Sequence, residues 1–215
     1  RQGEIGLRIN PLSTALGQAD LAALAASGLK PAFVMLPKVE TAAELAQADQ
    51  ALAAIDTVFI AQIETPRGLL DARAIAAASP RLQALMFGGF DYIVALRGRA
   101  SWESFFHPRV QLATIAAEAG VGCLDVPWLD IKDEAGLVAE TDRVIALGFT
   151  AKAAIHPAQV GPIQRRALDV PGGEAWPQLH ARMEVVALDR VPAQAVQAVG
   201  VDDVAIGGRA PGGDV

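Results

Sequence analysis

The chain lacks several features that would assign it to a specialised class. Its one cysteine among 215 residues, Cys123, excludes an internal disulfide and fits a reducing compartment such as the cytoplasm. No run approaches the roughly 18 apolar residues that a membrane-spanning helix needs. The formal net charge is −6 with no basic block, which argues against a nucleic-acid partner. No Gly-x-Gly-x-x-Gly follows a predicted strand, so the usual dinucleotide-binding signature is missing.

The composition is that of a globular protein. Hydrophobic residues make up 52% of the chain and charged residues 20%, which separates it from disordered proteins. A chain of this length can bury a full core, in one large domain or two small ones. A predicted strand begins almost directly after Arg1, and we therefore expect that upstream sequence is missing.

Apolar runs typical of strands alternate with helical patterns. Six strands are predicted at residues 6–10, 32–36, 58–63, 84–87, 121–126 and 151–155. Helices are expected at residues 20–25, 41–55, 69–78, 109–119 and 134–147, and residues 97–108 form a long polar connection. Thr41 and Glu44 have the spacing of a capping box at the start of the second helix. Strict alternation predicts a parallel sheet with right-handed crossovers.

Two layouts satisfy this alternation, an open doubly wound sheet and a closed (β/α)₈ barrel. The position of polar residues favours the barrel, whose strand ends form one face where active sites lie. In an open sheet the same residues would be spread along an edge tens of ångströms long. The six strands, a further one at residues 201–206 and one lost upstream would make eight. The polar residues at or after strand ends are Arg8, Lys38, Glu64, Asp91, Asp125 and His156.

Two of these residues form a candidate metal site. Glu64 follows the strand at 58–63, and Asp91 follows the strand at 84–87 after two glycines, 27 positions later. That spacing suits one strand–helix–strand unit. Mg²⁺ prefers oxygen ligands and retains several waters, so two carboxylates and a bidentate oxo-acid suffice. The pattern alone leaves open that each carboxylate only caps the following helix.

The remaining polar residues each have two interpretations. Arg8 either binds substrate or forms a structural ion pair, because a guanidinium in an apolar setting needs an anionic partner. Lys38 is either a Schiff-base lysine or an ion-paired surface lysine. His156 acts as a base or orients its loop by a hydrogen bond. Arg67 meets either a CoA phosphate or a carboxylate at a helix end. Asp125 either supports the residues that contact the ligand or is structural.

Five segments in order carry a family resemblance. They are residues 7–10 (Leu-Arg-Ile-Asn), 36–40 (Leu-Pro-Lys-Val-Glu), 63–68 (Ile-Glu-Thr-Pro-Arg-Gly), 87–92 (Phe-Gly-Gly-Phe-Asp-Tyr) and 154–159 (Ala-Ile-His-Pro-Ala-Gln). With them the chain resembles the citrate lyase β-subunit-like proteins of the HpcH/HpaI aldolase superfamily. The resemblance covers roughly residues 5–165.

The resemblance implies a TIM barrel of the phosphoenolpyruvate/pyruvate type and a Mg²⁺-dependent carbon–carbon lyase. Such an enzyme cleaves a 3-hydroxyacyl-CoA thioester, such as citryl-, malyl- or citramalyl-CoA, into an oxo-acid and an acyl-CoA. It implies that Glu64 and Asp91 ligate Mg²⁺ and that Arg8 is catalytic, binding the substrate's carboxylate or carbonyl oxygen. Amides around Gly88 and Gly89 are expected to hold the oxo-acid. A homo-oligomer, trimer or hexamer, in the cytoplasm is also implied.

The sequence departs from the family pattern at both ends of the chain. The family's first strand, with its own arginine motif, has no counterpart, and the sequence stops following the family beyond about Leu168. We therefore expect a barrel core at residues 1–168, from the second strand onward, and a divergent C-terminal segment at 169–215. Two alternatives stay open: a class II pyruvate-type aldolase acting on free hydroxy-oxo acids without CoA, and an inert barrel serving as a subunit or binding protein.

Overall fold

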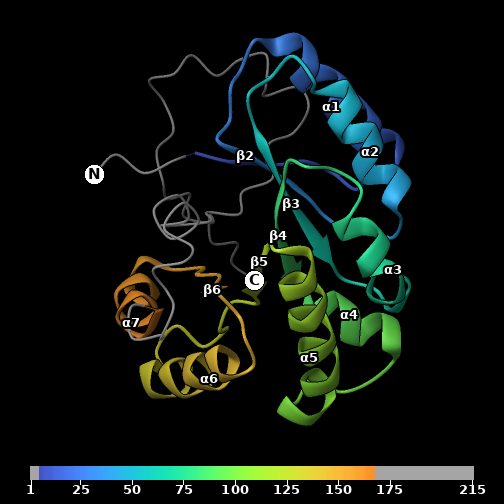
Figure 1. Ribbon diagram of the computed structural model, residues 1–215. Coiled ribbons are helices and arrows are strands. Elements are labelled where there is room, and N and C mark those ends of the chain that lie inside the picture. The colour runs from blue at the N-terminus through green and yellow to red at the C-terminus, as the bar shows by residue number, and fades with distance from the viewer. Residues whose placement is uncertain (1–4, 168–215) are drawn as a thin grey trace, which may run out of the picture.

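Six parallel strands form one sheet at the centre of the computed structural model, which describes residues 5–167 (Figure 1). The predicted strand at 201–206 and the segment 169–215 lie outside the described residues. The strands are β1 (Leu7–Arg8), β2 (Phe33–Leu36), β3 (Val58–Ile63), β4 (Leu82–Phe87), β5 (Gly122–Asp125) and β6 (Ala151–Lys152). All six fall within the predicted strand regions or extend them by two residues.

The order of the strands decides between the two predicted layouts. Each strand pairs in parallel with the next one in the sequence, from β1 to β6. A doubly wound sheet reverses its strand order at a switch point, whereas a (β/α)₈ barrel keeps consecutive order. The order therefore supports the predicted barrel class, and the described strands form an arc of it with β1 and β6 at its edges.

Seven helices follow the strands in the described part of the chain. They are α1 (Ala15–Ser27), α2 (Ala42–Ala51), α3 (Pro66–Ala76), α4 (Gly89–Leu96), α5 (Trp102–Ala119), α6 (Glu134–Ala146) and α7 (Pro157–Ala167). Figure 1 shows α1 to α5 along one face of the sheet, with α6 and α7 continuing around its end. The predicted capping box of α2 is confirmed, since Thr41 Oγ1 accepts from the Glu44 N–H and the Glu44 carboxylate accepts from the Thr41 N–H.

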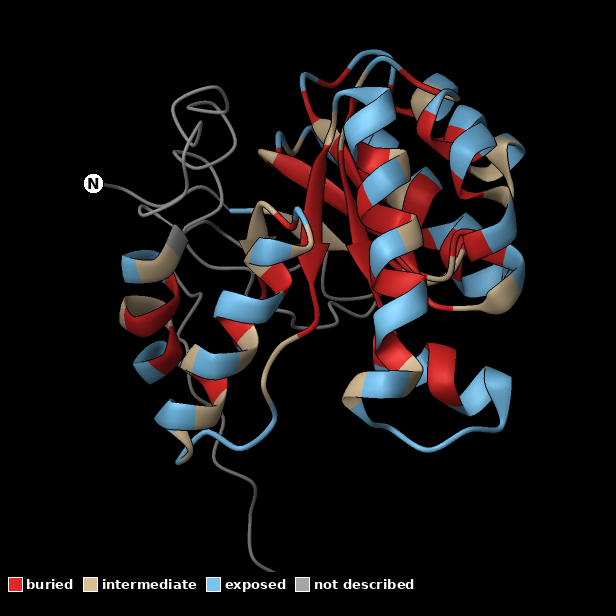
Figure 2. Cartoon of the chain, turned by 60° about the horizontal axis from the view of Figure 1, so that its bottom comes forward, coloured by how far each residue is buried: buried red, intermediate tan, exposed pale blue. Residues whose placement is uncertain are grey.

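Apolar side chains pack on both faces of the sheet. The outer face packs against the helices. Figure 2 shows the central strands mostly buried, and the helices buried on the side that faces the sheet. A separate cluster on the inner face contains Phe33, Met35, Ile60, Ala84, Met86, Leu124 and Ala153. A sheet that is apolar on both faces is what a parallel barrel requires.

The predicted polar connection at residues 97–108 is wrong over most of its length. Helix α5 begins at Trp102, after Ser101, whose Oγ accepts from the Ser104 N–H at 3.2 Å. Pro108 lies inside this helix although proline lacks the N–H that the helix needs there. Burial of Phe105, which packs edge-to-face on Phe87 with ring centroids 5.7 Å apart, favours the helix over the local cost of proline.

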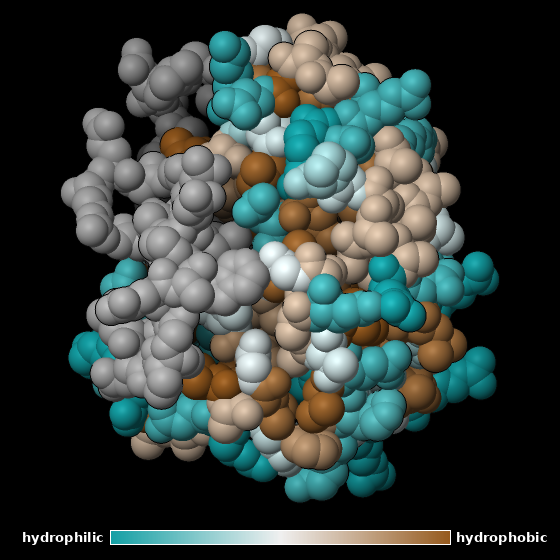
Figure 3. Space-filling model, viewed as in Figure 1, coloured by the Kyte–Doolittle hydropathy of each residue, from teal (hydrophilic) through white to brown (hydrophobic). Residues whose placement is uncertain are grey.

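The described surface is mixed in character. Figure 3 shows hydrophilic and hydrophobic side chains interspersed over the face that it presents. Several large apolar side chains are exposed, among them Leu70 on α3, Val94 on α4 and Phe106 on α5. None of the helices in residues 5–167 combines the length and the hydropathy required to span a bilayer.

Candidate metal and substrate site

Four charged side chains from successive strand ends meet at the carboxyl edge of the sheet. Arg8 ends β1, Lys38 follows β2, Glu64 follows β3, and Asp91 lies in the first turn of α4 after β4. The Arg8 Nη2 atom lies 3.6 Å from Glu64 Oε1, and the Lys38 Nζ atom lies 3.4 Å from Asp91 Oδ2. The structure thus brings together four of the six polar residues that the sequence placed at strand ends.

Arg8 projects toward the inside of the barrel. It pairs in register with Met35, and neighbouring residues in a parallel ladder share a face of the sheet. Met35 belongs to the inner apolar cluster, so Arg8 shares the inner face with it. The Arg8 side chain is only 19% exposed, and Glu64, once ionised, is an anionic partner beside it.

The residues that follow Glu64 hold it at the end of its strand. Thr65 is the N-cap of α3, and its Oγ1 accepts from the Gly68 N–H at 3.1 Å. Pro66 occupies the first helical position, where its fixed φ suits a helix start. The alternative that Glu64 merely caps this helix is therefore wrong, because Thr65 performs that role and leaves Glu64 free to face the site.

Gly88 allows β4 to approach Glu64 closely. A Cβ atom at this position would lie 2.2 Å from Glu64 Cγ, so any side chain here would force Glu64 to move. The Gly88 N–H donates to the Ile63 carbonyl oxygen at 2.8 Å. The role of Gly88 is therefore to let the backbone after β4 lie close to Glu64. Its N–H is already bonded within the protein and is not free to bind an oxo-acid. Gly89, the first residue of α4, remains the candidate amide donor for an oxo-acid.

Glu64 and Asp91 have very different electrostatic surroundings. Both Glu64 carboxylate oxygens are buried without a hydrogen-bond partner among the described residues. Burial, and after it the neighbouring Asp91 carboxylate, raises the pKa of Glu64 to about 8. The side-chain interaction with Glu64, and then the ammonium of Lys38, hold the pKa of Asp91 below its ordinary value. A proton on the pair therefore resides on Glu64.

The two carboxylates fit a hard divalent cation. Buried carboxylate oxygens with no partner are costly, and a cation would supply the missing interaction. No group of three or more His, Cys, Asp or Glu side chains suited to a metal occurs in residues 5–167, so these residues form no all-protein cage. Mg²⁺ would suit such a two-carboxylate site, because it prefers oxygen ligands and is usually held by only one or two carboxylates.

Asp125 ends β5 as predicted but does not join this site. It accepts from Arg109 at 2.8 and 3.0 Å and from Lys152 Nζ at 2.7 Å, on the side of the sheet that α5 and α6 cover. Glu140 on α6 completes the group with one bond from each cation. The interpretation of Asp125 as structural agrees with this buried ionic cluster of Arg109, Asp125, Glu140 and Lys152.

The sequence reasoning missed this cluster. Arg109 was placed only as a helix start and Lys152 only as a strand residue, yet their side chains are 0% and 1% exposed. Arg109 also lies over the Trp102 ring at 5.1 Å from its centroid. The sequence did contain a signal for the cluster: Lys152 lies inside an apolar predicted strand, and a basic side chain that is buried needs an acidic partner.

His156 and Arg67 have local partners and no ion pair with either carboxylate among residues 5–167. His156 is exposed, and its Nδ1 accepts from the Ala158 N–H at 3.2 Å, which agrees with a loop-orienting role. Arg67 Nε lies 3.3 Å from Asp71 Oδ2 on the same helix, and the Arg67 side chain is 67% exposed. Its position in the first turn of α3 puts this exposed cation at the carboxyl edge of the sheet.

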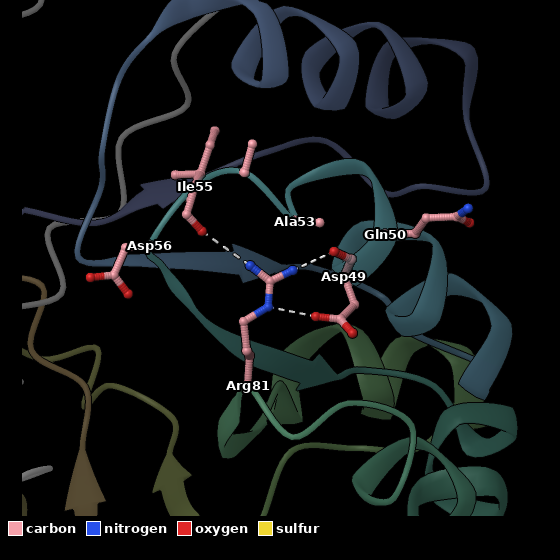
Figure 4. A pocket seen from close by; sticks show the side chains of 7 residues that line it. Asp49, Gln50, Ala53, Ile55, Asp56 and Arg81 are labelled. Atoms are coloured by element: carbon pink, nitrogen blue, oxygen red, sulfur yellow. Dashed lines mark hydrogen bonds and ion pairs between the residues drawn. The ribbon is translucent and has the colours of Figure 1, made fainter.

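A separate pocket lies at the opposite edge of the sheet. It is lined by the end of α2, the connection to β3 and Arg81, which directly precedes β4. Figure 4 shows that the Arg81 guanidinium is bonded to the Asp49 carboxylate and to carbonyl oxygens of Asp49 and Ile55. These bonds fix the end of α2, and we assign this pocket a structural role.

Comparison with known proteins adds an independent line of evidence. The family model described as HpcH/HpaI aldolase/citrate lyase matches residues 1–157. Human mitochondrial citramalyl-CoA lyase is 29% identical over 188 residues, which cover 79% of this chain and 55% of that protein. The chain thus spans little more than half the length of this relative.

Two solved structures are similar over most of the chain. RipC from Yersinia pestis has a TM-score of 0.75 and 38% sequence identity, with 80% of each chain covered. The citrate lyase beta subunit from M. tuberculosis, complexed with oxaloacetate and magnesium, has a TM-score of 0.65 and 34% identity. That match covers 75% of this chain and 72% of the M. tuberculosis chain.

Proposed function

Because this chain belongs to the HpcH/HpaI aldolase/citrate lyase family, we propose that it is a Mg²⁺-dependent carbon–carbon lyase acting on a 3-hydroxyacyl-CoA thioester. One observation carries the proposal. The buried carboxylate of Glu64 has no hydrogen-bond partner among the described residues, and it faces Asp91 and Arg8 at the carboxyl edge of the sheet. The M. tuberculosis relative that was solved with magnesium and oxaloacetate supports this ion and this class of product.

Glu64 and Asp91 would hold the ion, which when bound polarises the oxygen on the carbon that becomes the oxo-acid carbonyl. In cleavage, the 3-hydroxyl loses its proton and the adjacent carbon–carbon bond breaks. The bonding pair moves into the enolate of the acyl thioester, which then takes up a proton. Arg8 would stabilise negative charge on the reacting oxygen, because its guanidinium already lies beside the Glu64 carboxylate.

The proposal that the substrate is a CoA thioester, and not a free acid, has support other than the two carboxylates. The human relative is named for a CoA thioester, and the exposed Arg67 at the edge of the site offers a cation for a phosphate of CoA. The class II aldolase alternative would use the same two carboxylates but would leave Arg67 idle. The geometry of Glu64 and Asp91 is compatible with both, so the substrates must be compared directly.

The test compares thioesters with free acids. We expect the purified chain to cleave citramalyl-, malyl- or citryl-CoA with Mg²⁺ and to lose that activity with EDTA, as measured by chromatography of the CoA product. Glu64→Gln and Asp91→Asn should lose at least about a hundredfold in rate, whereas Glu118→Gln, at an exposed carboxylate on α5, should not. Full activity in either site variant would overturn the metal assignment, and equal turnover of the free acids would favour the aldolase.

The same proposal includes a homo-oligomer, a trimer or hexamer, in the cytoplasm. Exposed apolar side chains on two adjacent helices, Phe90 and Val94 on α4 and Phe106 and Val110 on α5, support a subunit contact. Light scattering coupled to gel filtration would measure the oligomeric state. A monomer with no Mg²⁺-linked rise in melting temperature and no lyase activity would instead favour the inert barrel.

A further inference from the structure

Lys38 has a backbone conformation that is unusual for a lysine. Its φ is 50°, and among the described residues only Arg97 shares a positive φ without being glycine. Arg97 is the C-cap of α4, where the left-handed conformation is common. Lys38 caps no helix; it follows Pro37 after β2. A strained residue that is held in place by its surroundings often serves a site.

The residue after Lys38 explains why the strain persists. The Val39 N–H donates to the Gln62 carbonyl oxygen of β3 at 3.2 Å. The Val39 carbonyl oxygen lies against Gly68, where a Cβ atom would approach it to 2.4 Å. The Val39 side chain is itself buried at 2% exposure. These three contacts fix Val39 and thereby hold Lys38 with its ammonium 3.4 Å from Asp91.

The charges in the site balance once Glu64 has released its proton, as a cation bound to both carboxylates requires. Glu64 and Asp91 carry two negative charges, and each has its own cation, Arg8 and Lys38 respectively. A lone Mg²⁺ would enter a site with no net charge and would meet the repulsion of both cations. Mg²⁺ together with a doubly charged oxo-acid, such as the oxaloacetate that citryl-CoA would release, adds no net charge. The four residues therefore favour loading of the ion and the anion together.

We propose that Lys38 is a positioning residue that exchanges partners during loading, pairing with Asp91 in the free site and with a carboxylate of the oxo-acid once Mg²⁺ occupies Asp91. This inference rests on the proposed function, because it takes Glu64 and Asp91 as the ligands of the ion. The Lys38 side chain is 44% exposed, and its four-carbon stem is flexible. The ammonium can therefore turn to a new partner while the backbone at Lys38 stays fixed.

Substitution at Lys38 separates the charge from the backbone conformation. Lys38→Asn removes the ammonium but keeps a residue that tolerates a positive φ. Lys38→Gly removes both the charge and the backbone strain. Lys38→Arg retains the positive charge. Lys132→Asn, at an exposed turn, serves as the control for loss of a lysine. Isothermal titration of the full chain would measure binding of Mg²⁺ alone and of oxalate, a doubly charged probe, at saturating Mg²⁺.

The expected result is a pair of changes with opposite sign. Lys38→Asn and Lys38→Gly should bind Mg²⁺ alone about three- to tenfold more tightly, because a cation beside Asp91 is gone. The same variants should bind oxalate about three- to tenfold more weakly at saturating Mg²⁺, while Lys38→Arg stays close to wild type. A general loss of structure would weaken both, so the opposite signs identify the exchange.

The outcomes also separate this inference from the proposed function. If wild type binds Mg²⁺ with oxalate, Glu64→Gln does not, and Lys38→Asn matches wild type in both titrations, the partner exchange is wrong and the metal site stands. Changes of the same sign in the two titrations would also overturn the exchange. If wild type binds no Mg²⁺ with oxalate, or Glu64→Gln binds it equally well, the proposed function fails and this inference fails with it.

Discussion

Glu64 and Asp91 face each other in one site from opposite environments: the side chain of Glu64 is 1% exposed and that of Asp91 is 51% exposed. The buried carboxyl keeps its proton to an unusually high pH, and the exposed one gives it up early. A cation that binds both must displace the proton from Glu64. This relationship makes stability and metal binding depend on pH in opposite directions.

Between pH 4.5 and about 8 the folded metal-free chain keeps a proton on Glu64 that the unfolded chain has released. The free energy of unfolding should therefore fall as pH rises through this window. Glu64→Gln has no proton to lose there, so at pH 9 we expect it to be roughly a few kcal/mol more stable than wild type in EDTA. The lowered pKa of Asp91 acts only at more acidic pH.

Urea unfolding at pH 5, 7 and 9 would measure this effect. Mg²⁺ with oxalate should restore the stability of wild type at high pH and should leave Glu64→Gln unchanged. Parallel pH profiles for the two proteins in EDTA would show that Glu64 does not carry the proton.

Gly88→Ala tests the close approach of β4 to Glu64. The new Cβ would lie 2.2 Å from Glu64 Cγ, so the carboxylate must move away from its present position. We expect a folded protein about 1–3 kcal/mol less stable, with Mg²⁺ and oxalate no longer raising its melting temperature. Gly161→Ala on α7 is the control, because its Cβ would meet only the flexible end of Arg165 at 3.3 Å. An unchanged Mg²⁺ effect in Gly88→Ala would contradict the geometry.

Lys152→Met tests the buried ionic cluster. The substitution leaves the carboxylates of Asp125 and Glu140 short of a cation inside the protein, which typically costs about 3–5 kcal/mol. Arg73→Ala removes an exposed pair with Glu118 and should cost at most about 1 kcal/mol. Denaturant unfolding would measure both. Because the cluster lies on the helix side of the sheet, the folded fraction of Lys152→Met should still bind Mg²⁺ with oxalate.

Arg67→Ala tests the proposed contact with CoA. The exposed guanidinium is far less constrained than Arg8, so its loss should raise the KM for the thioester about three- to tenfold and change kcat little. Arg165→Ala, at an exposed arginine on α7, is the matched control. Steady-state kinetics would decide; an unchanged KM in Arg67→Ala would remove Arg67 from the substrate site without touching the metal assignment.

Local sequence signals predicted most of the secondary structure. Apolar runs marked all six strands, and the strand at Val58–Ile63 matched to the residue. Gly28 and Gly120 end α1 and α5, and both adopt the positive φ that suits glycine as a C-cap. These signals are reliable because capping and strand burial depend on residues only a few positions apart. Over residues 102–108, the first part of α5, burial against a distant segment determined the helix, and the local signals there predicted a loop.

What the sequence determined by itself was the alternation of strands and helices, and with it the edge of the sheet where Arg8, Lys38, Glu64 and Asp91 had to lie. Parallel strands bring their carboxyl ends to one edge regardless of detail. The tertiary structure alone decided how each side chain is used there. It turned Asp125 toward Arg109, buried Glu64 against Gly88 and held Lys38 against Asp91. These outcomes depend on contacts between distant segments, whose distances and burial no local pattern encodes.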